Sequence, residues 1–176
     1  MSFDVKTFRR ALGCYATGIT VVTGRDGDGL FGITINSFTS LSLEPPLVLF
    51  CLGVTSRHHT RLRGLDAFAV NVLSEDQGAV SMHFASPASQ ERWEGVAQID
   101  REAGPPLLAG CIAHLDCTPE AFHDGGDHSI VVGRVQNLTW QADGQPLLYF
   151  RGRYGRLGEL FVPVLAPADL PPNRAS

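Results

Sequence analysis

The sequence is poor in lysine and in long apolar runs, and both shortages narrow what the protein can be. Lys6 is the only lysine among 176 residues, the formal net charge is −4, and no block of basic residues occurs. Because binding to nucleic-acid phosphates needs clustered Lys and Arg, no nucleic-acid groove is expected. The longest apolar stretches, near residues 46–52 and 130–135, fall far short of the roughly 20 residues that span a bilayer, so no membrane partner is expected.

Cysteines are also few, and this small number excludes a disulfide scaffold. The four that occur are scattered, so we expect free thiols in the core of a cytoplasmic protein. The charged N-terminal segment, unlike an export signal, favours the same compartment. Cys111, His114 and Cys117 have metal-like spacing, but in a strand the cysteines share one face and His114 points from the other, so no metal site is expected. No G-x-G-x-x-G or P-loop motif occurs, which excludes Rossmann and P-loop enzymes.

Hydrophobic periodicity predicts a mainly β protein, a β-barrel or α+β domain, with two or three helices. The runs 18–24 and 30–36 flank "RDGDG", which is the strongest hairpin signal in the chain. Further strands are expected over 45–53, 66–74, 107–122, 128–140 and 146–152. An amphipathic N-terminal helix is expected to cover one end of the sheet, 55–64 to form a short polar helix or loop, and a helix over 75–86 to be capped by Ser74 with Gln77. We expect one domain over 1–162 and a loose tail over 163–176.

Polar residues gather between two of the expected strands, over residues 31–50. Taken alone, Thr34, Asn36, Ser37, Thr39 and Ser40 favour turn bonding within the chain, with contact to the edge of a ligand as the alternative. Two later segments bear on this choice. "GDH" at 126–128 places an acid and a histidine at the lip of an apolar strand, and "RGRYG" at 151–155 places arginines and a tyrosine after another.

These segments carry a family resemblance. "YATGITVVTG", "GITINSFTSLSLEPPLVLF", "FAVNVLS", "GDHSIVVGRV" and "PLLYFRGRYG" occur in order across about residues 8–156 and resemble the flavin reductase-like family. The resemblance implies an FMN-binding split barrel that is a homodimer and binds FMN or FAD near the subunit interface. It also implies a role in supplying reduced flavin to a separate monooxygenase.

The resemblance also implies roles for individual residues. The flavin segment of the family falls on Thr34, Ile35, Asn36, Ser37 and Ser40, and the segment against the ring on Cys51 and Leu52. The phosphate loop falls on "TSRHH", with Ser56, Arg57 and His58 as donors. Phe84 matches an aromatic near the flavin, although core packing explains it equally well. His128 and Tyr154 resemble residues on the nicotinamide side.

The expected activity is hydride transfer from NADH to FMN or FAD, for which the cofactors contain the reactive atoms. The protein need only stack the rings and stabilise charge developing on the flavin. NADH is favoured over NADPH because the sequence assigns no arginine cluster to a 2′-phosphate, but Arg151, Arg153 and Arg156 leave NADPH open as the alternative. Two alternatives stay open: a non-catalytic FMN-binding protein for electron transfer or sensing, and a dimeric interaction module without flavin.

Overall fold

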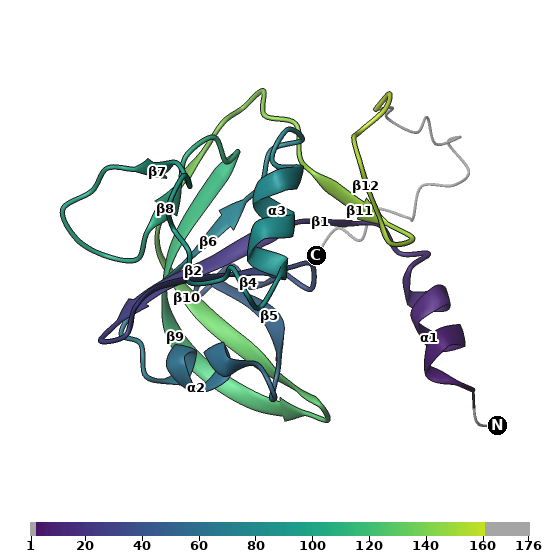
Figure 1. Ribbon diagram of the computed structural model, residues 1–176, viewed down its shortest axis with the longest axis horizontal. Helices are drawn as coiled ribbons and strands as arrows, with labels where there is room; N and C mark the ends of the chain where they lie inside the picture. Colours follow the sequence, from purple (N-terminus) through teal and green to yellow (C-terminus); the bar gives the residue numbers. More distant parts are fainter. Residues whose placement is uncertain (1–2, 161–176) are drawn as a thin grey trace, which may run out of the picture.

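The computed structural model describes residues 3–160, and its centre is a seven-stranded antiparallel sheet that curls into an open barrel (Figure 1). In spatial order the strands are β3 (Gly29–Ile35), β2 (Thr20–Asp26), β6 (Phe68–Val72), β9 (Ala113–Gly125), β10 (His128–Trp140), β5 (Leu47–Gly53) and β4 (Thr39–Ser42). A second sheet contains β1 (Thr17–Gly18), β11 (Leu148–Phe150) and β12 (Arg153–Gly155), and β7 (Gln98–Ile99) pairs with β8 (Leu107–Leu108). The prediction of a mainly β fold is confirmed.

The predicted hairpin is present and forms one end of the seven-stranded sheet, with β3 as its edge strand. Strands β2 and β3 pair antiparallel from Thr20 opposite Ile35 to Asp26 opposite Gly29. Gly29 has a φ of +109°, a value that only glycine adopts without strain, which explains the Asp-Gly sequence at this turn. Val21 and Val22 are both fully buried but belong to two different core clusters, because both faces of β2 are covered.

Two helices cover these two faces. Helix α2 (Arg57–Arg63) contributes Leu62 to the cluster inside the barrel, and helix α3 (Gly78–Ala85) contributes Phe84 to the cluster outside it. The predicted cap of α3 is only half correct. Gln77 Oε1 accepts a hydrogen bond from the Ser74 backbone N–H at 3.0 Å, but the helix begins at Gly78 and the Ser74 hydroxyl does not cap it.

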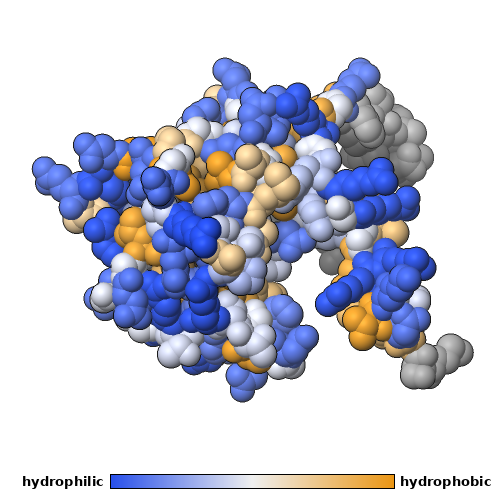
Figure 2. All heavy atoms as spheres, in the orientation of Figure 1, coloured by the Kyte–Doolittle hydropathy of each residue, from blue (hydrophilic) through white to orange (hydrophobic). Residues whose placement is uncertain are grey.

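The N-terminal helix was expected to cover one end of the sheet, and this expectation is wrong. Helix α1 (Val5–Leu12) has no buried residue, and it stands apart from the barrel beside β11 and β12 (Figure 1). Its apolar side chains form an orange patch on a mostly blue arm (Figure 2), and Phe8 and Leu12 are 47% and 56% exposed. Its amphipathic pattern is real, but within residues 3–160 no side chain of the helix is buried.

The expected placement of two cysteines is also wrong. Cys111 precedes β9 and packs in the outer cluster, whereas Cys117 lies within β9 and packs in the cluster inside the barrel. Burial raises the pKa of both thiols to about 12. In the part of the chain that the structure describes, no group of His, Cys, Asp and Glu side chains is arranged to hold a metal ion.

The barrel has a seam where β4 stops pairing with β5. The pairing runs only as far as Thr39 opposite Leu49, which leaves the backbone of Cys51 without a strand partner on that side. The Ser37 hydroxyl takes this place: it accepts from the Cys51 N–H at 2.9 Å and donates to the Cys51 carbonyl at 3.3 Å. A side chain thereby replaces a strand, and the surface beyond it stays open.

Two sequence expectations concern the ends of the chain. The predicted tail over 163–176 and the last residues of the predicted domain lie outside the described residues, so the boundary at 162 stays a prediction. Within residues 3–160, no helix is long and apolar enough to cross a membrane.

Candidate functional site

The seam opens into a groove at the ends of three strands. Strand register places His128, the first residue of β10, directly opposite Gly53, the last residue of β5. A hollow of about 290 Å³ lies at this point, and we call it the ring groove. It is lined by Ile33, Ile35, Asn36, Ser37, Cys51, Leu52, Gly53, Ser56 and His128. Seven of the residues that the sequence singled out therefore meet here, although four separate segments supply them.

The polar groups of the ring groove have different tasks. Ser37 is occupied by the backbone of Cys51, so its side chain holds the barrel together. Asn36 is exposed, and its side-chain amide bonds to no other residue of the described chain. Leu52 is buried and contributes an apolar floor together with the partly buried Ile33. The groove thus has an apolar base, with Asn36 as the free polar side chain on one rim.

An acid and a histidine form the opposite rim. Nδ1 of His128 lies 2.8 Å from Oδ1 of Asp127, which fixes the ring so that Nε2 faces Gly53. This hydrogen bond, together with the positive charge of Arg9, holds the pKa of the Asp127 carboxyl below its usual value. A β-carbon added at Gly53 would lie 3.8 Å from Nε2 of His128, so glycine keeps the space before the imidazole open.

A larger hollow of about 710 Å³ continues from the ring groove along the start of α2. It shares Ile33, Gly53 and Ser56 with the groove and adds Thr55 and Arg57. The Ser56 hydroxyl caps α2 by accepting from the His58 N–H at 3.3 Å. Arg57 is held by Glu91 at 3.3 Å and by the Pro87 carbonyl. Hydroxyl groups and one guanidinium therefore lie where the sequence predicted a phosphate loop.

His58, which the sequence also assigned to this loop, points the other way. Its side chain is fully buried, stacks on Phe31 with ring centroids 4.6 Å apart, and bonds through Nε2 to Gln90 Oε1 at 3.0 Å. Burial, followed by the charges of Arg61 and Arg57, lowers its pKa. His58 is therefore a core residue and not a phosphate donor. The sequence missed this because the short helix turns successive side chains toward opposite sides.

Phe84 is likewise a core residue. It is fully buried beside Trp93 and fills the space above Gly32, where an added β-carbon would lie 2.6 Å from its ring. Of the two interpretations of Phe84, core packing holds. Ser40 lies exposed on β4, paired with Val48, and lines neither the ring groove nor its extension along α2.

Tyr154 lies in a separate hollow of about 270 Å³ that also reaches Asn36. Its hydroxyl is 2.8 Å from Oγ of Ser81, a buried residue of α3, and the Ser81 carbonyl accepts from the Thr34 hydroxyl at 2.7 Å. Thr34 and Tyr154 are thus fixed through one residue that the sequence analysis missed. His128 and Tyr154 do not share a hollow, and Asn36 lies between them.

Fold and site together define a small split-barrel protein with a groove that suits a flat ring with polar edges. Residues 12–158 match the model of the flavin reductase like domain. The chain belongs to this family, so the resemblance read from the sequence is confirmed.

Individual relatives are similar to this chain over most of their length. The chain is 40% identical over 153 residues to the reductase subunit HsaB of a flavin-dependent monooxygenase from Rhodococcus jostii, covering 87% of this chain and 78% of that protein. It is 43% identical over 160 residues to an NADH-dependent FAD reductase from Streptomyces globisporus, covering 87% and 86%. A structure of the S. globisporus NADH:FAD oxidoreductase SgcE6 with NAD and FAD fragments superposes with a TM-score of 0.83, at 40% identity, covering 90% and 97%.

The burial of His58 makes the stability of the fold depend on pH. Its pKa is lowered in the folded protein, so between that value and the ordinary value of 6.5 the unfolded chain binds a proton that the folded chain does not. We expect the free energy of unfolding to fall as the pH drops from 7 toward 5. In a His58→Gln variant the slope should be smaller, by up to about 1.4 kcal/mol per pH unit. Urea denaturation at several pH values measures both slopes, and parallel curves for the two proteins would contradict this role.

Proposed function

We propose that the protein transfers hydride from NADH to FAD or FMN and releases the reduced flavin to a separate monooxygenase. The observation that supports this most is the ring groove, in which the ends of β3 and β5 face the Asp127–His128 pair. The relatives named above are described as an NADH-dependent FAD reductase and as the reductase subunit of a flavin-dependent monooxygenase. Another relative is an NADH-dependent FMN reductase by name, so both flavins are within the proposal.

The residues present fit a flavin. The isoalloxazine ring is apolar on its faces and polar along one edge, and the groove offers the same division. Ile33, Ile35 and Leu52 form its base, and Asn36 supplies an amide on the rim. The flavin phosphate suits the extension along α2, where Thr55, Ser56 and Arg57 offer two hydroxyls and a guanidinium.

When bound, the flavin and the nicotinamide supply the atoms between which the hydride moves, so no nucleophile is required of the protein. The task of the chain is to orient the two rings and to exclude water. Asn36 is placed to hold the polar edge of the flavin. His128, held by Asp127, presents Nε2 across Gly53 and positions the nicotinamide. Tyr154, held by its hydrogen bond with Ser81, lines the hollow on the other side of Asn36 from His128.

The proposal includes a homodimer. The apolar face of α1, with Val5, Phe8 and Leu12 all exposed, is a surface that a soluble single chain rarely leaves bare. Leu138 and Trp140 at the end of β10 are exposed as well. A second copy of the chain that covers these side chains would explain why they are apolar. Sedimentation equilibrium of the purified protein should give twice the chain mass of 19.0 kDa, and a mass of one chain would rule the dimer out.

The proposal also includes a cytoplasmic location. All four cysteines are free, including the exposed Cys14, which a reducing compartment permits.

The activity itself is tested by absorbance. Added to NADH and free FAD or FMN, the purified protein should reduce the flavin with saturation in both substrates. The anaerobic spectrum before and after NADH separates the alternatives. A bound yellow chromophore that NADH leaves oxidised would indicate a flavin carrier, and no flavin binding at all would indicate an interaction module. Flavin reduction no faster than in buffer would refute the catalytic proposal.

His128→Ala should damage the use of NADH more than the binding of flavin, because His128 stands on the rim and not on the base of the groove. We expect kcat/KM for NADH to fall about tenfold or more, and the Kd of FAD to change less than about threefold. Asp127→Asn keeps the imidazole but weakens the hydrogen bond that orients it, so its loss of kcat/KM for NADH should lie between the wild type and His128→Ala. Equal losses in both quantities, or no loss in either, would remove His128 from the nicotinamide side.

A further inference from the structure

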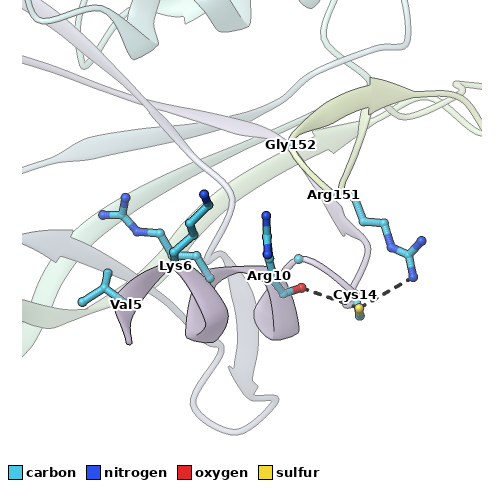
Figure 3. A pocket seen from close by; sticks show the side chains of 8 residues that line it. Val5, Lys6, Arg10, Cys14, Arg151 and Gly152 are labelled. Carbon is cyan, nitrogen blue, oxygen red and sulfur yellow. Dashed lines mark hydrogen bonds between the residues drawn. The ribbon is translucent and has the colours of Figure 1, made fainter. Parts of the chain in front are cut away.

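Four cationic side chains from opposite ends of the sequence surround one hollow, which we call the cationic cleft. The cleft lies between α1 and the β11–β12 hairpin and has a volume of about 730 Å³. Lys6, Arg9 and Arg10 line it from α1, and Arg151 lines it from the hairpin turn. Figure 3 shows Lys6 and Arg10 rising from one side of the helix toward this hairpin. Among the residues that the structure describes, no acidic side chain lines the cleft.

These charges have no partner in the described part of the chain. Elsewhere in the described chain Arg57, Arg61, Arg101, Arg134 and Arg156 form ion pairs, whereas Arg25, Arg63, Arg92 and Arg153 form none. Lys6, Arg9, Arg10 and Arg151 form none with any residue between 3 and 160. In a chain of net charge −4, the cleft is therefore a local positive region that is open to an anion.

The backbone of Arg151 supports a functional purpose for its side chain. Arg151 has a φ of +49° and the following Gly152 a φ of +77°, so both occupy the left-handed region in a tight turn. Asn, Asp and Gly are the residues usual at such a position, and arginine is disfavoured there. An arginine in a backbone conformation that arginine disfavours points to a role for its side chain.

The two walls of the cleft are fixed to each other. The Arg151 N–H donates to the carbonyl of Gly13, directly after α1, at 3.0 Å. The Arg151 guanidinium also lies 3.8 Å from Sγ of Cys14 (Figure 3). It lies over the ring of Phe150 as well. The cleft is thus formed before any ligand arrives. Solvation, and the favourable position of Arg9 and Arg10 in the last turn of α1, explain single charges but not their convergence with Arg151.

The cationic cleft continues into the ring groove. A hollow of about 600 Å³ between them is lined by Arg9 and Arg151 at one end and by Asn36 and Ser37 at the other. Asn36 and Ser37 also line the ring groove. The His128 hydrogen bond is the main cause that lowers the pKa of Asp127, and the charge of Arg9 is the smallest of the causes. A ligand whose ring lies in the groove can therefore extend toward α1.

We propose that the cationic cleft binds the diphosphate of a dinucleotide whose redox ring lies in the ring groove. The proposal rests on the function proposed above and extends its binding site to α1. Arginine suits a diphosphate because the guanidinium donates two parallel hydrogen bonds to phosphate oxygens. FAD and NADH share the required chemistry, an adenosine diphosphate half, and the experiments below distinguish them. If FAD is the ligand, its flavin phosphate lies in the cationic cleft and not in the extension along α2.

The first experiment measures binding without catalysis. Isothermal titration calorimetry with adenosine diphosphate as the probe should show binding to the full chain that weakens as salt is raised. In the double variant Arg9→Ala/Arg10→Ala the affinity should fall about tenfold or more. Arg25→Ala is the matched control: it removes an exposed arginine from the far hairpin, distant from α1 (Figure 1), and should bind as the wild type does. No binding to the wild type, or equal affinity in wild type and double variant, overturns the proposal.

The second experiment identifies the dinucleotide. Steady-state kinetics are compared for NADH against reduced nicotinamide mononucleotide, and for FAD against FMN. A rise in KM with NADH but not with its mononucleotide, in the double variant, assigns the cleft to NADH. A rise with FAD but not with FMN assigns it to the flavin. Equal changes for all four substrates, or none, overturn the proposal. If the wild type reduces no flavin yet binds adenosine diphosphate through these arginines, the proposed function fails and the anion site stands.

Discussion

The hydroxyl of Ser37 is the contact on which the groove depends. Strand β4 leaves β5 after Leu49, and without a partner the backbone of Cys51 would be bare at a sheet edge. By accepting and donating at once, Ser37 satisfies both groups without bringing in another strand. The space that a strand would have filled becomes the groove. The pairing of Gly53 with His128 then places the Asp–His pair on its far rim.

The hydroxyl-rich stretch therefore serves structure more than ligand contact. Thr34 bonds to the carbonyl of Ser81, Ser37 closes the seam, and Ser40 lies outside the groove. Asn36 is left free, between the hollow that contains His128 and the hollow that contains Tyr154. The polar edge of a ring in the groove would thus meet one amide and the backbone beside it.

Features encoded by local sequence patterns were predictable here. Strand alternation, the Asp-Gly turn and the segments of the family resemblance placed the barrel and seven of the groove residues. Features that depend on the rotation or docking of a helix were not. His58 follows the cap residue Ser56 by only two positions, yet it faces the core. The amphipathic pattern of α1 predicted a helix but could not show that its apolar face is bare. Arg9 and Arg151 are brought together only by the folded chain.

The hydrogen bond from Arg151 to Gly13 makes the N-terminal arm and the β11–β12 hairpin one mechanical unit. The same hairpin carries Tyr154, whose hydroxyl rests on Ser81 beside the groove. A neighbour that binds α1 would therefore touch an element joined to the hairpin that holds Tyr154 in the hollow beside Asn36.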